Sequence, residues 1–308
     1  MRHLTITAVA LAALVAAPLA AQETKPTPGP IEEKSLVTGK AKFEPGMGYV
    51  HVQSQTRIFG TLLRVPDDAT RETYQQDWEK AFAKAQKKYT SALSSWRSAV
   101  KVAEQTKAKP PAKPVEPTRE NFSIDPIELR DMVSFGPMFV FAKAQNRFDY
   151  VNAVKPGTYI YYGVVTAAPN MPAGGTCACM GSVKFEVKAG VVTDLGNFLY
   201  TAPKPEAPFD YATLQGLKWA EERKAKGKDV PVINSVIEFG LPASLKDWPS
   251  EKADFRASGK INNFFLIPIT RLAPIPGVLA YRRDTVIDVK SGQDLPNPVI
   301  KSVVKPKL

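Results

Sequence analysis

The chain has 308 residues, 44% of them hydrophobic and 23% charged, with a formal net charge of +11. This size and composition allow a substantial hydrophobic core and exclude a wholly disordered chain, and two cysteines are too few for a disulfide-stapled scaffold. The two histidines are His3 and His51, so histidine-based zinc sites and most serine-hydrolase triads lack the residues that they need.

The first 21 residues have the layout of a secretory signal peptide. A basic start at Arg2 precedes the apolar run Leu4–Val15, and small residues then lead to a polar break after Ala21. The rival interpretation, a retained membrane anchor, is disfavoured because the run is short for a bilayer span. We therefore expect an exported protein, periplasmic or extracellular, that does not span a membrane after processing.

The positive charge has a different meaning outside the cytoplasm. A basic intracellular protein would suggest nucleic acid as a ligand, whereas an exported one is expected to meet acidic envelope components and no nucleic acid. The alternative is that the charge serves solubility and is spread over the surface, which the mostly interspersed lysines and glutamates favour.

Residues 22–45 are expected to form a flexible lead-in to a β-rich domain that spans residues 46–300. The lead-in is polar and rich in proline, a composition typical of unstructured chain. Within the domain, Gly48–Val65 is rich in β-branched and aromatic residues with partial alternation, which predicts one or two strands.

A long helical insertion is predicted at residues 70–108. This stretch holds no glycine or proline, and its apolar side chains recur every three or four residues, close to the helical period. The stripe consists of Tyr74, Trp78, Phe82, Ala85, Tyr89, Leu93, Trp96, Val100 and Ala103. Thr70 is expected to cap the helix start and Pro110–Pro111 to stop it, and a proline-rich linker at 109–121 returns the chain.

The apolar stripe needs a cover. Amphipathic helices normally bury such a face against a sheet or another helix, but a helix of about 55 Å overhangs a sheet whose strands are roughly 20 Å long. We therefore expect Tyr89, Leu93 and Trp96 to contact an envelope protein or a second copy of the chain, unless a shorter helix expected at 209–228 covers them. Basic side chains on the polar faces would then set the affinity for acidic envelope components.

The rest of the domain is predicted to be mostly strands, with a tail at 301–308. Ser182–Gly196 alternates apolar and charged residues and is expected to form an antiparallel hairpin that turns at Ala189–Gly190. Further strands are expected at Met132–Ala142, Lys155–Val165, Ile261–Leu272 and Gly277–Val289. The predicted fold class is α+β and β-rich, an antiparallel β-sandwich-like domain interrupted by the long helical insertion.

The two cysteines, Cys177 and Cys179, leave three interpretations open. A mutual disulfide suits an oxidising compartment, but neighbours at i and i+2 of a strand are roughly 6.5 Å apart and a disulfide needs Cβ atoms near 3.8 Å, so the chain would have to turn there. Buried free thiols are the second interpretation. The third is a Cu(I) site with Met171 and Met180, although no histidine is near and methionine is a common core residue.

No catalytic residue and no cofactor is predicted from the remaining residues. His51 lies in a predicted strand and is expected to be an ordinary strand residue rather than a general base, which would need a partner and a shifted pKa. Carboxylates such as Asp125, Glu128, Asp194 and Asp210 occur in ordinary numbers. A hydrolase needs only two of them, but nothing in the sequence indicates a pair.

Two segments carry a resemblance. Lys155–Val165 holds a PGxY element, and Ser182–Phe198 holds an FxVxAGxVxxLGxF element. The matching residues are Pro156, Gly157, Tyr159, Phe185, Val187, Ala189, Gly190, Val191, Leu195, Gly196 and Phe198. In these elements the chain resembles uncharacterised secreted bacterial proteins, and no characterised family is matched. The resemblance implies an envelope setting and a β-sandwich module, and it transfers no catalytic residue.

Together these features predict an exported, non-enzymatic envelope binding or assembly protein that acts through a helix face or a sheet edge. The first alternative is a hydrolase of envelope polymers that depends on carboxylates. The second is a Cu(I)-handling protein that uses Cys177, Cys179, Met171 and Met180.

Overall fold

The computed structural model describes residues 28–144, 146–166, 172–201, 211–228 and 236–302. The predicted signal peptide, the candidate copper ligand Met171 and the carboxylate Asp210 lie outside these ranges.

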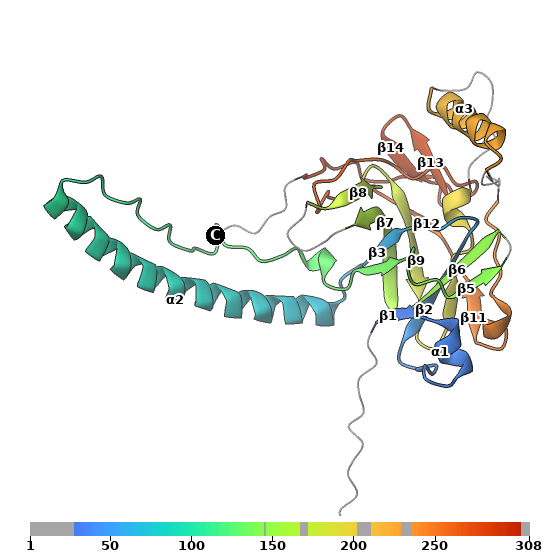
Figure 1. The fold of residues 1–308 in the computed structure, drawn as a ribbon, viewed down its shortest axis with the longest axis horizontal. Coiled ribbons are helices and arrows are strands. Elements are labelled where there is room, and N and C mark those ends of the chain that lie inside the picture. The colour runs from blue at the N-terminus through green and yellow to red at the C-terminus, as the bar shows by residue number, and fades with distance from the viewer. Residues whose placement is uncertain (1–27, 145, 167–171, 202–210, 229–235, 303–308) are drawn as a thin grey trace, which may run out of the picture.

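The described strands form three sheets (Figure 1). In the first sheet the order is β1-β6-β2-β10-β11, with β5 also paired to β6, and in the second it is β12-β9-β7-β3-β4, with β8 also paired to β7. The third sheet is small, β13-β14-β15. Neighbouring strands are antiparallel, except that β10 runs parallel to β2 and to β11.

The strand bounds are β1 (Gly29–Ile31), β2 (Gly48–Ser54), β3 (Gly60–Arg64), β4 (Val133–Phe135), β5 (Ala142–Ala144), β6 (Arg147–Val154), β7 (Gly157–Thr166), β8 (Gly174–Cys177), β9 (Ser182–Val187), β10 (Val192–Asp194), β11 (Ser250–Lys252), β12 (Arg256–Ser258), β13 (Leu279–Arg282), β14 (Thr285–Asp288) and β15 (Gln293–Asp294). The helices are α1 (Glu33–Val37), α2 (Asp68–Thr106) and α3 (Tyr211–Ala225), with short 3₁₀ turns η1 (Ile127–Leu129), η2 (Phe198–Tyr200) and η3 (Ala243–Leu245). The prediction of a mixed fold with antiparallel sheets and one long helix is confirmed.

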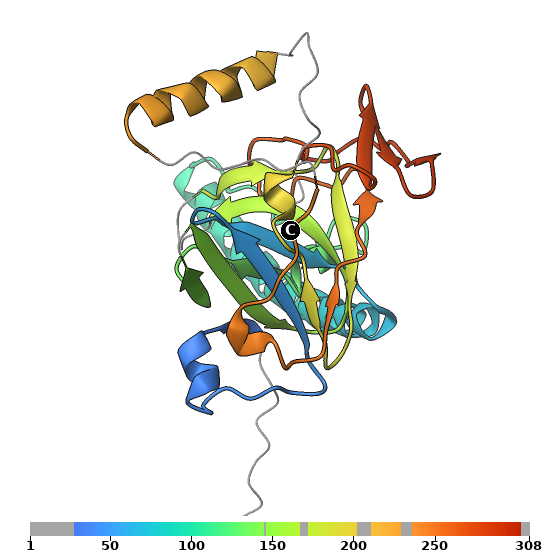
Figure 2. The ribbon, with the colours of Figure 1, turned by 90° about the vertical axis from the view of Figure 1, so that its right-hand side faces the viewer.

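The first two sheets contribute to the same hydrophobic core. Val52 of β2 and Tyr150 of β6, in the first sheet, belong to one buried cluster with Leu62 of β3, Tyr159 of β7 and Phe185 of β9, in the second. In Figure 2 the strands of these sheets are seen together, with α2 pointing away from the viewer behind them. Burial of the large aromatic side chains in this cluster is the main stabilising contribution that the structure makes visible.

The prediction of an antiparallel hairpin at Ser182–Gly196 is wrong. Strand β9 has the expected alternation of buried and exposed side chains and pairs with β7 and β12. After the turn at Ala189–Gly190, however, the chain crosses to the first sheet, where β10 pairs with β2 and β11. All three residues of β10 are buried, which is the pattern of a strand covered on both faces rather than of a hairpin arm.

Three other predicted segments also differ from the structure. The lead-in contains ordered elements, because β1 pairs with the edge of β6 and is followed by α1, and an edge position tolerates Pro30. The strand expected at Met132–Ala142 shrinks to β4, after which Met138 is 80% exposed. Ile261–Leu272 forms no regular strand, although it makes an isolated bridge between Ile269 and Cys177 and backbone hydrogen bonds with the segment from Cys177 to Gly181.

Helix α2 lies between β3 and β4 and projects away from the sheets as a single curved rod (Figure 1). With 39 residues it extends for about 58 Å at 1.5 Å per residue. It starts two residues earlier than predicted, and its N-cap is Asp67, whose carboxylate accepts from the Thr70 backbone N–H at 2.8 Å. It ends at Thr106, and its C-cap residue, Lys107, has the left-handed backbone conformation and precedes the prolines. Among the described helices none is long and apolar enough to cross a bilayer.

Candidate functional site

The candidate site is the element formed by α2 and the segment that returns beside it, residues 107–122, which we call the arm. In Figure 1 the return segment runs back along α2 toward the sheets. Near the tip, the Trp96 indole N–H donates to the Pro111 carbonyl at 2.9 Å. Nearer the sheets, the ring of Phe122 lies 5.5 Å from Phe82 and 5.6 Å from Trp78, between centroids. The two segments are therefore antiparallel neighbours over most of the arm.

The return segment covers the apolar stripe. Phe82 and Ala103 are buried, and the other stripe residues, including Tyr89, Leu93 and Trp96, are half-buried. The sequence predicts that a second copy of the chain, a partner protein or the shorter helix at 209–228 covers the stripe. In the structure the chain's own proline-rich linker lies against the stripe. Contact of Tyr89, Leu93 and Trp96 with a partner stays a prediction, and these side chains are less available than the sequence indicates.

One arginine of the second sheet binds the start of α2 and the chain that follows the arm. The side chain of Arg64, on β3, is 8% exposed and donates to Asp67 at the start of α2 at 2.5 Å. Its other nitrogens donate to Asp131, which follows the η1 turn beyond the arm, at 3.3 Å and to the Pro156 carbonyl at 2.9 Å. The hydrogen bonds that Arg64 and Thr70 donate to Asp67 hold the pKa of this carboxyl well below its usual range. The shared guanidinium ties the base of α2 to the sheet.

Positive charge is concentrated on the distal part of the arm. Residues 80–113 contain nine lysine or arginine residues against one acidic residue, Glu104, so this part carries +8 of the net +11 of the chain. All nine cations are exposed: Lys80, Lys84, Lys87, Lys88, Arg97, Lys101, Lys107, Lys109 and Lys113. In the described part of the chain, the ion pairs that involve them comprise a single long contact, Lys80 with Asp77 at 4.0 Å. The expectation that charge is evenly spread is therefore wrong.

The helical lysines lie mainly on the side of α2 opposite the covered stripe. At 3.6 residues per turn, positions 80, 84, 87, 91, 94, 98 and 101 form one row roughly 180° from the stripe. We call this row the outer ridge, and it consists of Lys80, Lys84, Lys87, Ser91, Ser94, Ser98 and Lys101, all exposed. Like charges at i, i+3 and i, i+4 destabilise a helix by about 0.2–0.5 kcal/mol per pair, so this spacing has a cost that an interspersed pattern would avoid.

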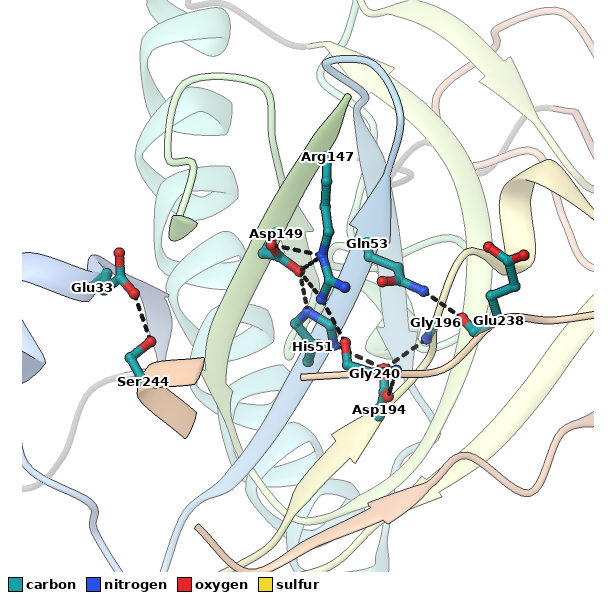
Figure 3. A network of polar contacts seen from close by, with 10 residues as sticks. All are labelled: Glu33, His51, Gln53, Arg147, Asp149, Asp194, Gly196, Glu238, Gly240 and Ser244. Carbon is teal, nitrogen blue, oxygen red and sulfur yellow. Dashed lines mark hydrogen bonds and ion pairs between the residues drawn. The ribbon is translucent and has the colours of Figure 1, made fainter. Parts of the chain in front are cut away.

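A second group of polar residues is buried in the first sheet (Figure 3). His51 on β2 lies between two carboxylates, with its Nδ1 2.8 Å from Asp194 on β10 and its Nε2 2.8 Å from Asp149 on β6. Arg147 donates from Nε to Asp149 at 2.9 Å and from Nη2 to the Gly240 carbonyl at 2.6 Å. His51 is fully buried, and the two aspartates are 2% and 4% exposed.

The geometry favours a protonated imidazole. Burial alone would lower the pKa of His51, but hydrogen bonds to Asp149 and Asp194 outweigh it and raise that pKa. Burial would raise the pKa of Asp149, and its hydrogen bonds with His51 and Arg147 lower it instead. Two carboxylates facing an imidazolium and a guanidinium give a network without net charge, as buried ionic groups require.

This network is closed. The Gly240 and Gly196 backbone N–H groups donate to the Asp194 carboxylate at 2.7 and 2.9 Å, and both imidazole nitrogens already have acidic partners. A general base needs a nitrogen that can reach a substrate proton, and in this arrangement His51 offers none. The sequence indicated no carboxylate pair, yet the structure brings Asp149 and Asp194 together around one ring, where they brace three neighbouring strands.

The cysteines form a disulfide, and both are fully buried. The Cα atoms of Cys177 and Cys179 are 5.0 Å apart, closer than neighbours in an extended strand, because β8 ends at Cys177 and the chain turns at Ala178. Of the three interpretations, the structure selects the disulfide, in which the sulfurs are not available as thiolate ligands. Met180 is half-buried beside them.

Within the part of the chain that the structure describes, the other candidate carboxylates do not form a site with Asp194. Asp125 and Glu128 lie near the base of the arm, on the chain that leads into β4, far along the sequence from Asp194. Across the described ranges, no group of three or more histidine, cysteine, aspartate or glutamate side chains is arranged to hold a metal ion.

Comparison with family models, with curated proteins and with solved structures finds no match to this chain. This agrees with a resemblance that involves only uncharacterised secreted proteins and no characterised family.

Two features of the site have signals in the sequence. The charge of the arm is visible once residues 80–113 are counted separately from the whole chain. The buried network has a weaker signal: Asp149 stands within the predominantly apolar run from Phe148 to Val154, where an unpaired carboxylate is rare. His51 is 98 residues from Asp149 and 143 residues from Asp194 along the chain. These contacts cannot be found without knowing the fold.

Proposed function

We propose that this is an exported, non-enzymatic binding or assembly protein of the bacterial envelope, in which the arm is the contact element. The observation that carries the proposal is the arm itself, a rod of about 58 Å that projects from the sheets with its cations exposed. Nothing in the packing of the sheets requires such a rod, because its apolar face is covered by its own return segment.

The attachment of the arm supports the same function. Arg64 bonds to Asp67 at the start of α2 and to Asp131 on the chain that follows the arm, so the base of α2 is held against the second sheet. A preorganised element loses less conformational entropy on binding than a flexible tail with the same charges. The arm is thus suited to reach a partner at a distance from the β-domain.

For the β-domain we propose a sandwich-like arrangement that serves as the base of the arm. Its support is the common core, in which side chains from β2 and β6 of the first sheet lie in one cluster with those of β3, β7 and β9 of the second. Sheets that pack face to face share a core in this way.

The two alternatives have less support. A groove of about 430 Å³ beside the buried network is lined by two carboxylates, Asp194 and Glu251. A two-carboxylate hydrolase needs a pair free to reach a substrate, but Asp194 is bonded to His51 and two backbone N–H groups, and Glu251 pairs with Lys188. A Cu(I) site would first require reduction of the buried Cys177–Cys179 disulfide.

The proposal is tested by photo-crosslinking in intact cells. A diazirine amino acid replaces Lys87 on the outer ridge or, as a matched control, Lys246, an exposed lysine of the β-domain. We expect adducts of increased mass from position 87 and few or none from position 246. Absence of adducts from position 87, or equal yields from both positions, would show that the arm is not the contact element.

A further inference from the structure

The outer ridge has the chemistry of a site for a linear polyanion. Resting on the proposed function, which places the arm outside the cytoplasm, we propose that the ridge binds a linear acidic polysaccharide, a chain of sugars that bears carboxylates at regular intervals. The partner is inferred from charge complementarity, since the 34 residues of the distal arm carry +8 of the chain's net +11 and four of their nine cations lie on the ridge.

The spacing of the ridge suits a repeating ligand. Lys80, Lys84 and Lys87 follow one another at i+4 and i+3, which places neighbouring Cβ atoms about 5–6 Å apart, close to the length of one pyranose unit. Further along the ridge, Ser91, Ser94 and Ser98 separate this group from Lys101. Small side chains leave a low surface over which a polymer can lie while lysines contact it at both ends.

The type of side chain distinguishes a polysaccharide from a protein partner. Protein interfaces rely on buried tryptophan, tyrosine and arginine, and lysine is depleted in them. The outer ridge has only lysine and serine, while the two tryptophans of α2, Trp78 and Trp96, contact the return segment. Lysine ammonium groups are compact point charges on flexible stems, and they can follow a ligand whose carboxylates have no fixed partner geometry.

A membrane surface is a poorer fit. Interfacial helices insert a wide apolar face between lipid headgroups, but the apolar face of α2 lies under the return segment. Val102 in the distal arm and Val115 just beyond it are the exposed large apolar side chains of this region, too few to anchor it in a bilayer. Single-stranded nucleic acid would need exposed aromatic rings for base stacking, and the ridge has none.

The first experiment measures binding of the purified full chain to polygalacturonate, with neutral dextran, phosphatidylglycerol vesicles and duplex DNA as competing ligands. We expect binding to polygalacturonate and not to dextran, with an affinity that falls steeply as salt rises, because association releases counterions. Tighter binding to the vesicles or to DNA would overturn the proposal in favour of those ligands. No binding to polygalacturonate would overturn it directly.

The second experiment uses two triple variants with the same change in net charge. Lys84→Glu, Lys87→Glu, Lys101→Glu reverses the ridge, and Lys40→Glu, Lys42→Glu, Lys246→Glu reverses three exposed lysines of the β-domain and the lead-in packed on it. Because lysine and glutamate have similar helix propensities, the ridge variant should keep its helical circular dichroism. We expect the ridge variant to lose affinity by at least roughly tenfold and the control to stay within about twofold of wild type. Equal losses in both variants would contradict a site on the ridge. If the chain does not bind polygalacturonate while position 87 still crosslinks to a protein, the proposal of a polysaccharide ligand is wrong and the proposed function stands.

Discussion

His51 connects three neighbouring strands of the first sheet through one imidazole ring. Its two nitrogens bond to Asp149 on β6 and Asp194 on β10, and Arg147 then links Asp149 to the backbone at Gly240. Since breaking a buried ion pair leaves an uncompensated charge, each member of this network depends on the others. The network therefore contributes to stability as a unit, and its residues are poor candidates for surface chemistry.

Removing the imidazole should destabilise the fold strongly. We expect His51→Gln to lower the free energy of unfolding by about 3 kcal/mol, because the neutral amide leaves one buried carboxylate without a charged partner. Urea denaturation followed by tryptophan fluorescence gives this value. The matched control is Asp254→Asn, which removes the surface partner of Lys290 and should cost at most about 1 kcal/mol. Equal losses in the two variants would mean that the buried network is not a stabilising unit.

The same network predicts how stability depends on pH. The folded-state pKa of His51 lies above its ordinary value of 6.5, so its stabilising contribution is fully present below pH 6.5 and is lost as pH rises through the folded-state pKa. The pKa of Asp149 is lowered, so its contribution is present at neutral pH and is lost as pH falls through that lowered value. We expect the urea midpoint of wild type to fall as pH rises above 6.5, and the fall to be absent in His51→Gln. A parallel fall in both proteins would assign it to other groups.

At the scale of elements, the arm depends on the contact between α2 and its return segment. An isolated helix with many lysines and serines would be marginal in water, and most of its stability must come from packing of its apolar face. Trp78, Phe82 and Phe122 supply that packing near the sheets, and Arg119 adds an ion pair with Glu79 at 3.0 Å. The return segment is thus part of the folded arm and not a passive linker.

Loss of one aromatic ring should open the arm without unfolding the sheets. We expect Phe122→Ala to increase amide hydrogen exchange along α2 by on the order of tenfold or more, since a buried aromatic residue replaced by alanine costs roughly 3 kcal/mol or more locally. Exchange in β2 and β7 should not change. Val115→Ala, at a position that is 71% exposed on the same segment, is the control and should leave exchange in the arm as in wild type. Slower or unchanged exchange in Phe122→Ala would show that the return segment does not hold the helix.

Local patterns in the sequence identify the elements better than they identify their partners. The period of three to four residues from Tyr74 to Ala103 was enough to locate α2, and the alternation around Phe185 was enough to locate β9. Neither pattern specifies what lies opposite. The segment that covers the stripe has neither helical nor strand periodicity. The strand after β9 pairs in another sheet. Neither contact can be predicted without knowing the long-range packing of the chain.

Considered as a whole, the molecule separates two tasks between two parts. The β-domain contains the hydrophobic core, the disulfide and the buried network, in which His51 and both aspartates are closed to solvent and Arg147 is partly exposed. The distal arm holds most of the net charge and exposes it. A charge of this density raises the rate of encounter with anionic partners and makes their binding sensitive to salt.

The central claim, that the outer ridge attaches this protein to envelope material, is tested most directly by co-sedimentation. Wild type, the ridge triple variant and the β-domain triple variant are each mixed with the isolated envelope fraction of the producing cells over a range of salt concentrations. We predict that wild type and the β-domain variant sediment with the envelope at about 0.05 M salt and are released toward 1 M, where the Debye length shrinks to roughly 3 Å. The ridge variant should remain in the supernatant throughout. Sedimentation of the ridge variant to the same extent as wild type would contradict the account.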